Sequence, residues 1–260
     1  MVHFVGAGSG AADLITLRGK RLLEEADVII YAGSLVNPAL LDYAKKDCQI
    51  HNSAYLHLDG IIDLMKDAET KGFTTVRLHT GDPSIYGAIR EQMDRLKEAG
   101  IDYDICPGVS SLCGAAAALK SEYTLPGVSQ SVIITRMGGR TPVREQESMK
   151  SLAAHGATMV IFLSAGLLTE LVAQLLAGGY REDTPAAIVY KATWEDEKVL
   201  RCTVSELAVM AKQHGITKTA LITVGGFLGD DYALSKLYDA QFTTEFRDGN
   251  YHNGIHETGR

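Results

Sequence analysis

The sequence predicts an α/β protein made of two α/β domains, and three observations support this fold class. Short β-rich apolar runs alternate with longer segments of helical periodicity along most of the 260 residues. Several strand-like runs end in loops of small residues that lead into helical patterns. The alternation stops at residues 120–128, where Pro126 and Gly127 carry turn chemistry, and then starts again. We therefore expect an N-terminal domain over residues 1–119 and a C-terminal domain over residues 120–240.

The N-terminal half predicts a mostly parallel sheet. The run at residues 28–31 is apolar throughout, as expected of a strand that is covered on both faces. We expect strands over residues 2–5, 28–31, 73–78 and 103–106, and helices over residues 16–26, 61–71, 87–99 and 107–119. A further helix is expected to begin at Asn37 and Pro38.

The C-terminal half predicts a mixed sheet. We expect strands over residues 131–135, 159–163, 186–190, 199–203 and 220–224, and helices over residues 145–155, 167–177 and 205–213. Ser205 is the expected cap of the last helix. The fourth strand is expected to pair with the third as an antiparallel hairpin around Trp194. The chain turns polar beyond Leu237, and we expect residues 248–260 to be disordered.

Composition and charge exclude several function classes. Hydrophobic residues make up 46% of the chain and charged residues 22%, as in ordinary soluble enzymes. The formal net charge is -7 and no run of Lys or Arg forms a basic stripe, so we expect no binding of nucleic acid. The apolar region at residues 158–177 contains Glu170 and Gln174 and is broken by Ser164 and Gly166. It therefore predicts a strand, a turn and a helix, and no membrane span.

We expect a cytoplasmic protein with free thiols and no structural metal. The N-terminus begins with a strand-like run and lacks the basic start and apolar block of a signal peptide. The cysteines form no Cys-x-x-Cys pair, and each lies in or beside an apolar segment where a thiol packs as a small hydrophobe; they are Cys48, Cys106, Cys113 and Cys202. The histidines show no His-x-x-x-His pair and no Ser-His-Asp arrangement, which gives little support to zinc chemistry or hydrolysis.

The first loop of the chain matches the relaxed form of a dinucleotide-binding fingerprint. Gly6 and Gly8 are followed by Ala11 at the third position of the pattern. A nicotinamide cofactor also needs an acidic residue at the end of the second strand, but that strand ends in the Tyr-Ala-Gly of residues 31–33. A nicotinamide oxidoreductase is therefore disfavoured. The alternative role for these glycines is a tight turn that lets a helix pack on the sheet.

Residues 79–87, with the sequence HTGDPSIYG, form a second candidate motif at a turn from a strand into a helix. Gly81, Asp82 and Pro83 lie at the expected carboxyl end of the strand, where α/β sheets bind small ligands. A similar junction occurs at residues 107–111, and two adjacent junctions of small residues predict a trough that admits an adenosine-sized ligand. Asp82 is a weak candidate for a general base, because an Asp in a turn more often holds the backbone of that turn.

Three arginines lie in a loop of Gly and Pro residues at 135–144. In an acidic protein, this local cluster of Arg136, Arg140 and Arg144 suits a ligand that carries carboxylates, and the alternative is a solvated loop. The only tryptophan, Trp194, lies at the expected bend between two strands, where packing is a commoner role than ligand recognition.

With these motifs collected, the chain resembles the tetrapyrrole methyltransferases over nearly its whole length. The family pattern is a Gly-x-Gly-Pro-Gly loop, a Gly-Asp-Pro turn and a Pro-Gly-(Val/Ile)-(Ser/Thr) junction, which correspond to residues 6–10, 81–83 and 107–110. Ser9 stands where the family usually has Pro, and Ala11 stands where it often has Asp. We therefore expect the first loop to be less rigid than is usual in the family, which weakens the argument for a direct role of this loop.

Four further stretches resemble one branch of this family, at residues 31–36, 79–83, 135–143 and 189–194. That branch methylates carbon 11 of precorrin-4 or cobalt-precorrin-4, giving precorrin-5 or its cobalt form, in the corrin pathway to vitamin B12. The resemblance leaves open whether the substrate carries cobalt. Other tetrapyrrole positions, the methylation of diphthamide's precursor and a non-catalytic nucleotide-binding module are the alternatives.

The resemblance implies two α/β domains with the active site in a cleft between them. It also implies S-adenosylmethionine as the methyl donor, S-adenosylhomocysteine as a product, and a homodimer. The residues it assigns to the cofactor are Thr80, Gly81, Asp82, Ile85, Tyr86, Ser110, Ser111, Leu163, Ala192, Thr219 and Ala220. For the tetrapyrrole we expect Arg136, Arg140, Tyr190 and Lys191, with the arginine loop facing the acetate and propionate groups.

This reaction class places a limit on acid–base catalysis. A sulfonium methyl is already activated, so the protein must chiefly align it with a nucleophilic ring carbon. Orientation contributes about 7 to 11 kcal/mol, whereas one general base contributes about 10² to 10⁴ in rate. We therefore expect no essential acid or base, and we expect Asp82 to matter mainly for cofactor binding.

Overall fold

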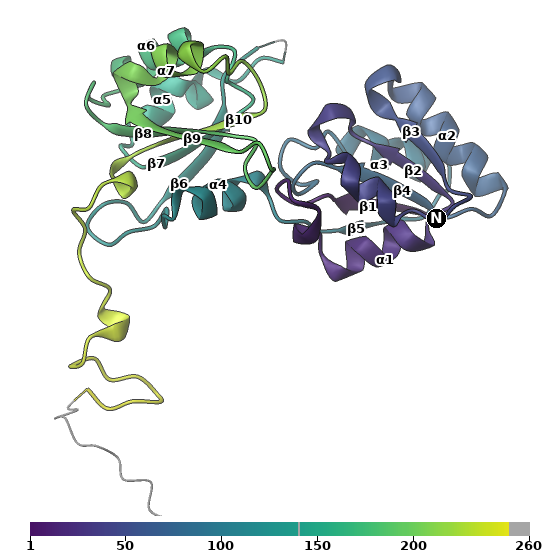
Figure 1. Ribbon diagram of the computed structural model, residues 1–260, viewed down its shortest axis with the longest axis horizontal. Helices are drawn as coiled ribbons and strands as arrows, with labels where there is room; N and C mark the ends of the chain where they lie inside the picture. Colours follow the sequence, from purple (N-terminus) through teal and green to yellow (C-terminus); the bar gives the residue numbers. More distant parts are fainter. Residues whose placement is uncertain (140, 250–260) are drawn as a thin grey trace, which may run out of the picture.

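The computed structural model describes residues 1–139 and 141–249, whose two halves form two lobes, each built on a five-stranded sheet (Figure 1). In the N-terminal lobe the strands lie in the order β3-β2-β4-β1-β5, and every neighbouring pair is parallel. The elements that follow one another up to residue 119 are β1 (Val2–Gly6), α1 (Leu17–Glu25), β2 (Val28–Tyr31), β3 (Gln49–Asn52), α2 (Leu58–Thr70), β4 (Thr75–His79), α3 (Arg90–Glu98), β5 (Tyr103–Cys106) and α4 (Ser111–Leu119).

Helices cover both faces of the N-terminal sheet. On one face, Phe4 and Ile30 pack with α2 and α3. On the other face, Val5 and Leu78 pack with α1 and with the 3-10 helix Pro38–Tyr43. Because neighbouring residues of a strand point to opposite faces, both faces need apolar residues, which explains the uninterrupted apolar run of β2.

The C-terminal lobe contains a mixed sheet in the order β6-β7-β10-β8-β9. Its elements are β6 (Val132–Arg136), α5 (Met149–Ala153), β7 (Thr158–Phe162), α6 (Leu168–Ala177), β8 (Pro185–Tyr190), β9 (Lys198–Thr203), α7 (Leu207–Gln213) and β10 (Ala220–Val224). Strands β6 and β7 are parallel, and the remaining pairs are antiparallel. The predicted α/β fold class, with a parallel and a mixed sheet, is therefore confirmed, as is the hairpin of β8 and β9.

Helix α4 packs on the C-terminal sheet, although the expected domain boundary at residue 119 assigns it to the N-terminal domain. Its residues Ala115 and Leu119 share an apolar cluster with Val160 and Val189 of that sheet. Helices α5, α6 and α7 cover the opposite face. The chain thus passes from one sheet to the other at residues 107–110, before the change in composition that the sequence shows.

Local interactions explain where other elements depart from expectation. Strand β3 was not expected; its polar and apolar residues lie at a half-exposed sheet edge. The helix expected from residue 87 begins only at Arg90, because Tyr86 and Ala88 have positive φ angles of 54° and 51° that no α-helix accommodates. The segment that begins at Pro38 is a 3-10 helix, not an α-helix.

Two helix starts in the C-terminal lobe also differ. The helix expected over residues 145–155 consists of the 3-10 turn Glu145–Glu147 and the short α5, which Ser148 caps. Ser205 is not the cap of the last helix, because it lies within the 3-10 helix Val204–Glu206 that precedes α7. Thr203 and Glu206 form the capping box of this 3-10 helix, in which the Thr203 N–H donates to Oε2 of Glu206 at 2.8 Å.

Three further features complete the fold. After β10, the 3-10 helix Gly226–Leu228 still packs on the C-terminal lobe through the buried Phe227, and the later residues up to 249 run away from that lobe (Figure 1). The rest of the expected disordered tail, residues 250–260, lies outside the described residues. All four cysteines are free; Cys106 is buried, but Cys113 is exposed, because it lies on the face of α4 opposite Ala115 and Leu119. Within residues 1–139 and 141–249, none of the helices has the length and apolar character that a bilayer crossing requires.

Candidate active site

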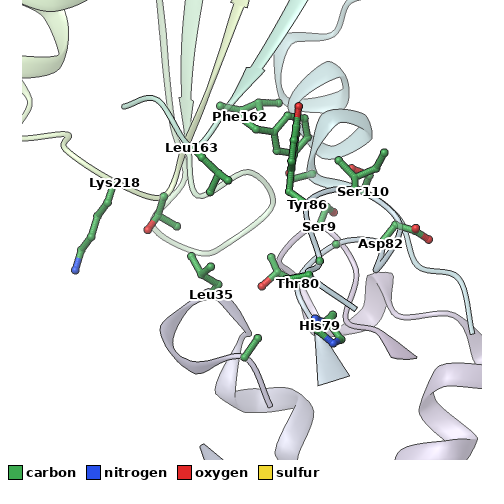
Figure 2. A pocket seen from close by; sticks show the side chains of 18 of the residues that line it. Ser9, Leu35, His79, Thr80, Asp82, Tyr86, Ser110, Phe162, Leu163 and Lys218 are labelled. Atoms are coloured by element: carbon green, nitrogen blue, oxygen red, sulfur yellow. The ribbon is translucent and has the colours of Figure 1, made fainter. Parts of the chain in front are cut away.

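A cavity of about 590 Å³ lies between the two lobes, at the ends of their strands (Figure 2). Its walls come from the loops after β4 and β5, the loops after β7 and β8, and the segment before β10. This is the edge at which α/β sheets bind ligands, and the volume suits a small-molecule site. All eleven residues that the resemblance assigns to the cofactor line this cavity, namely Thr80, Gly81, Asp82, Ile85, Tyr86, Ser110, Ser111, Leu163, Ala192, Thr219 and Ala220.

Three glycines allow the loops of the N-terminal lobe to touch backbone to backbone. A Cβ on Gly6 would lie 2.6 Å from both the Cα of Gly108 and the carbonyl oxygen of Gly81, and a Cβ on Gly108 would lie 2.2 Å from that same oxygen. Gly8 and Gly81 also exchange backbone hydrogen bonds, at 3.3 and 3.0 Å. The glycines of the first loop therefore serve close packing, and this packing fixes the position of the turn at residues 81–83.

Asp82 joins the two junction loops through its carboxylate. One oxygen accepts a hydrogen bond from the Gly108 N–H at 2.8 Å, and the other accepts from the Ser84 N–H at 2.8 Å and from the Ser84 hydroxyl. Burial raises the pKa of Asp82, but the hydrogen bonds from Ser84 and Gly108 outweigh this effect, so the pKa lies below its ordinary value. The carboxylate is thus a weak base whose lone pairs already hold the backbone.

Unusual backbone conformations gather around the cavity. Of the seven described non-glycine residues with positive φ, five line it, namely Tyr86, Ala88, Leu163, Lys191 and Thr219. Such conformations cost on the order of 1 kcal/mol each and are typical of ligand sites. Leu163, which follows β7, has a positive φ and is 65% exposed, and it lies across the cavity from Leu35 of the N-terminal lobe (Figure 2).

The loop between β8 and β9 is tied to the first loop of the chain. The Thr193 hydroxyl accepts a hydrogen bond from the Ala11 N–H at 3.0 Å and lies 3.1 Å from the Ser9 hydroxyl. A Cβ on Gly10 would lie 2.3 Å from the Trp194 ring, so this glycine is needed for the ring to pack there. Trp194 therefore packs against the other lobe while it also lines the cavity.

The four residues expected to bind the tetrapyrrole lie in different places. Lys191 lines the main cavity, and its Nζ donates to Asp196 at 2.6 Å and lies 5.5 Å from the centre of the Tyr190 ring. Tyr190 itself is not part of the cavity wall. Arg136 lines a second hollow of about 470 Å³, which shares Tyr86 with the main cavity. Arg140 lies outside the described residues.

Arg77 also lines the cavity although the sequence did not point to it, and His79 lines it although it was expected only as part of the motif at residues 79–87, with no role of its own. Arg77 is 5% exposed and His79 is 4% exposed. In β4, Arg77 stands between Val76 and Leu78, and His79 ends the strand after Leu78. Burial, and then the charge of Arg77, lower the pKa of His79 to about 3, so this imidazole is neutral. A signal was available in the sequence, since these two residues interrupt a strand whose other side chains suit a sheet covered on both faces.

Comparison with known proteins identifies a family and individual relatives. The family model of the tetrapyrrole (corrin/porphyrin) methylases matches residues 1–208. The chain is 57% identical to the cobalt-precorrin-4 C(11)-methyltransferase of Methanocaldococcus jannaschii, over 95% of both chains. It is 46% identical to the enzyme of the same name from Priestia megaterium, over 95% of this chain and 98% of that one. It is 43% identical to the precorrin-4 C(11)-methyltransferase of Pseudomonas aeruginosa, over 95% and 99%.

Solved structures show the same architecture. An X-ray structure of a cobalt-precorrin-4 methyltransferase superposes with a TM-score of 0.86 at 44% identity, covering 88% of this chain and 96% of that chain. A uroporphyrin-III C-methyltransferase from Thermus thermophilus, solved in complex with S-adenosylhomocysteine, has a TM-score of 0.71 at 23% identity, covering 87% and 92%, and shows the shared fold alone.

Proposed function

The chain belongs to the tetrapyrrole (corrin/porphyrin) methylase family, and from this premise we propose that it methylates carbon 11 of precorrin-4 or cobalt-precorrin-4, with S-adenosylmethionine as the methyl donor. The observation that carries this proposal is the 57% identity, over 95% of both chains, to a relative named for that reaction. Relatives at 46% and 43% identity are named for the same ring position. The product is precorrin-5 or its cobalt form.

The residues of the main cavity fit S-adenosylmethionine. The volume of about 590 Å³ accommodates a nucleoside with an amino-acid side arm. Leu163 offers an exposed apolar surface, and the Thr80 hydroxyl is buried with no partner among the described residues. These features support the assignment of the eleven expected cofactor residues, from Thr80 to Ala220, to this site.

S-adenosylmethionine, when bound, supplies a methyl group that its sulfonium already activates. The part left to this chain is orientation, which contributes about 7 to 11 kcal/mol in favourable cases. The glycine contacts among Gly6, Gly81 and Gly108 keep the site rigid. Asp82 contributes to the same rigidity, because both of its oxygens accept hydrogen bonds from the loops. The chain therefore acts by positioning, and Asp82 needs to transfer no proton.

The tetrapyrrole is proposed to extend from the main cavity past Tyr86. Tyr86 lines both hollows, which supports a path from Lys191 in the first to Arg136 in the second. Tyr190 acts indirectly, by packing against Lys191. Binding of the tetrapyrrole by Arg140 remains a prediction. The relatives named for the cobalt-bearing substrate have the higher identities, 57% and 46% against 43%, and this makes cobalt-precorrin-4 the first substrate to test.

Incubation with isotope-labelled S-adenosylmethionine tests the function. The protein should transfer one labelled methyl group to cobalt-precorrin-4 or precorrin-4, which mass spectrometry detects. Parallel titrations with S-adenosylhomocysteine and NAD test the oxidoreductase alternative, and we expect only the first to bind. Binding of S-adenosylhomocysteine without transfer to any tetrapyrrole would instead indicate a binding module.

A homodimer and a cytoplasmic location are also proposed. The segment at residues 225–249 exposes large apolar side chains, which a second copy of the chain would cover; they are Tyr232, Leu234, Leu237, Tyr238, Phe242 and Phe246. Light scattering on the full chain and on a chain that ends at residue 229 checks this. The full chain should be a dimer, and the shortened chain should dissociate more readily.

A further inference from the structure

Strand β4 carries a buried arginine that has no carboxylate partner among the described residues. The Nε of Arg77 donates to Oε1 of Gln92 and its Nη1 donates to the carbonyl of Ile30, both at 3.0 Å. Its Nη2 has no hydrogen-bond partner among the residues that the structure describes. Burial lowers the pKa of Arg77 to about 10, which still leaves a cation at neutral pH. Because a buried charge without a counter-charge is costly, its presence needs an explanation.

Arg77 lines an extension of the main cavity between β4 and helices α2 and α3. We call this extension the inner chamber; it is lined by Leu58, Ile61, Arg77, His79 and Gln92. Gln92 is itself fixed, since its Nε2 donates to the carbonyl of Ala88 at 3.1 Å, and this turns its Oε1 towards Arg77. The guanidinium is therefore held in place from two sides.

Two further polar atoms, in residues that follow Arg77 closely in the chain, are buried without partners among the described residues. They are Nε2 of His79 and the hydroxyl oxygen of Thr80, and both residues line the same cavity. In Figure 2, His79 lies at the end of β4 with Thr80 next to it. A neutral imidazole and a hydroxyl can each donate one hydrogen bond. The region thus offers one cation and two neutral donors, a set that suits an anion.

We propose that the inner chamber binds a carboxylate of a ligand held in the main cavity, with Arg77 as its cation and His79 and Thr80 as hydrogen-bond donors. Arginine suits this role because its planar N–H groups match the two oxygens of a carboxylate. The inference rests on the proposed function, since both ligands proposed there carry carboxylates. One is the amino-acid end of S-adenosylmethionine, and the others are the acetate and propionate groups of the tetrapyrrole.

Calorimetric titration of wild-type protein and of Arg77→Gln distinguishes these two sources. The cofactor probes are S-adenosylhomocysteine and 5′-methylthioadenosine, which lacks the amino-acid end. The tetrapyrrole probe is cobalt-precorrin-4, through its KM and kcat in methyl transfer. Arg90→Gln is the matched control, because it removes the same charge from an exposed side chain that pairs with Asp94 on the surface. The control should leave all values within about twofold of wild type.

If the chamber holds the cofactor carboxylate, Arg77→Gln should weaken the binding of S-adenosylhomocysteine by about 10- to 100-fold and leave the affinity for 5′-methylthioadenosine within about twofold of wild type. If it holds a tetrapyrrole carboxylate, both cofactor probes should bind as before and the KM for cobalt-precorrin-4 should rise by about tenfold or more, with kcat nearly unchanged. Thr80→Val, which is nearly isosteric, should give a smaller loss of about threefold for the same probe. If Arg77→Gln does not fold, the Thr80→Val variant is used for the same measurements in its place.

The inference is overturned if folded Arg77→Gln and Thr80→Val bind every probe as wild type does, because Arg77 then only holds Gln92 and Ile30. Equal weakening of S-adenosylhomocysteine and 5′-methylthioadenosine would also overturn it, since a distorted cavity affects both. Failure of the proposed function looks different, because wild-type protein would then transfer no methyl group, whatever its variants bind.

Discussion

Arg77 lines the main cavity and Arg136 lines the second hollow, and the protein holds these two arginines in opposite ways. Arg136 is the last residue of β6 and donates to the carbonyls of Met137 and Thr141 in the loop that follows, at 3.0 and 3.1 Å. Arg77 is buried in β4, fixed by Gln92, and keeps its Nη2 without a described partner. One guanidinium organises a loop, while the other lacks the negative charge that its burial requires.

The difference shows that position near a cavity does not make a side chain available to a ligand. Arg136 would have to exchange its loop carbonyls for a carboxylate, in a solvent-exposed hollow where ion pairs contribute about 0 to 1 kcal/mol. Arg77 would gain its missing partner inside the protein, where water screens charge less. We therefore expect changes around Arg77 to have larger effects than equivalent changes around Arg136.

The largest expected effect comes from a substitution that disturbs the backbone contacts among Gly6, Gly81 and Gly108, compared with one in the loop of Arg136. Gly108→Ala places a Cβ 2.2 Å from the Gly81 carbonyl and should lower the free energy of unfolding by more than about 3 kcal/mol. Gly139→Ala, in the loop of Arg136, has no heavy atom within 4 Å of its new Cβ and should change it by less than about 0.5 kcal/mol. Urea unfolding measures both. Similar values for the two variants would show that the junction around Asp82 is not rigid.

The next effect is a loss of stability in acid that depends on Arg77. The pKa of His79 is lowered to about 3 in the folded protein, from 6.5 in the unfolded chain. The contribution of the neutral His79 to the free energy of unfolding is therefore complete above pH 6.5 and is lost as the pH falls towards 3. This loss should lower the free energy of unfolding by about 2 kcal/mol between pH 6.5 and about pH 4.5.

The pH dependence of urea unfolding tests this loss. In His79→Gln the slope over this range should flatten. In Arg77→Met it should shrink, because the charge of Arg77 contributes to the low pKa of His79, whereas Arg136→Met should keep the wild-type slope. A slope that is unchanged in His79→Gln would assign the acid sensitivity to other groups.

A smaller effect is expected at Asp82, which lies in the loop after β4 and lines the main cavity. Asp82→Asn keeps the size of the side chain but weakens its hydrogen bonds from Ser84 and Gly108. We expect the Kd for S-adenosylhomocysteine to rise by about fivefold to tenfold and kcat at saturating cofactor to fall by less than about threefold. Calorimetry and steady-state rates separate the two values. A loss confined to kcat, with binding intact, would identify Asp82 as a catalytic base.

The smallest effect is expected at Arg136 itself. Arg136→Gln should raise the KM for the tetrapyrrole by about twofold to threefold and leave cofactor affinity unchanged, because the side chain lies in an exposed hollow and is engaged by its own loop. Steady-state kinetics with cobalt-precorrin-4 gives both constants. An increase in this KM larger than the largest fold-change that Arg77→Gln causes, in cofactor affinity or in KM, would reverse the ranking of the two arginines.

Local composition was sufficient to predict the fold class and the junction loops. The apolar run at residues 28–31 and the loops at residues 81–83 and 107–111 carry their information in neighbouring residues, and the structure puts these loops at one edge. The loops at residues 81–83 and 107–111 meet at the cavity because parallel strands bring their carboxyl ends together. The expected cofactor residues of the C-terminal lobe, such as Ala192 and Thr219, came from the family resemblance, and they lie at the ends of antiparallel strands.

Features that depend on distant contacts could not be predicted in this way. Helix α4 follows the N-terminal strands in sequence, but its partners Val160 and Val189 come from the other sheet. The burial of Arg77 depends on α2 and α3 covering one face of β4, which its own neighbours in sequence do not show. Arg136 was singled out because a cluster of arginines is visible locally, whereas its bonds to loop carbonyls are not.

The most direct test of the whole account is the position of the transferred carbon. Wild-type protein, incubated with S-adenosylmethionine labelled with ¹³C in its methyl group and with cobalt-precorrin-4, should yield a product whose NMR spectrum shows one enriched methyl group, attached to carbon 11. Enrichment at another ring carbon, or none although S-adenosylhomocysteine binds, would contradict the assignment of this protein to carbon-11 methylation.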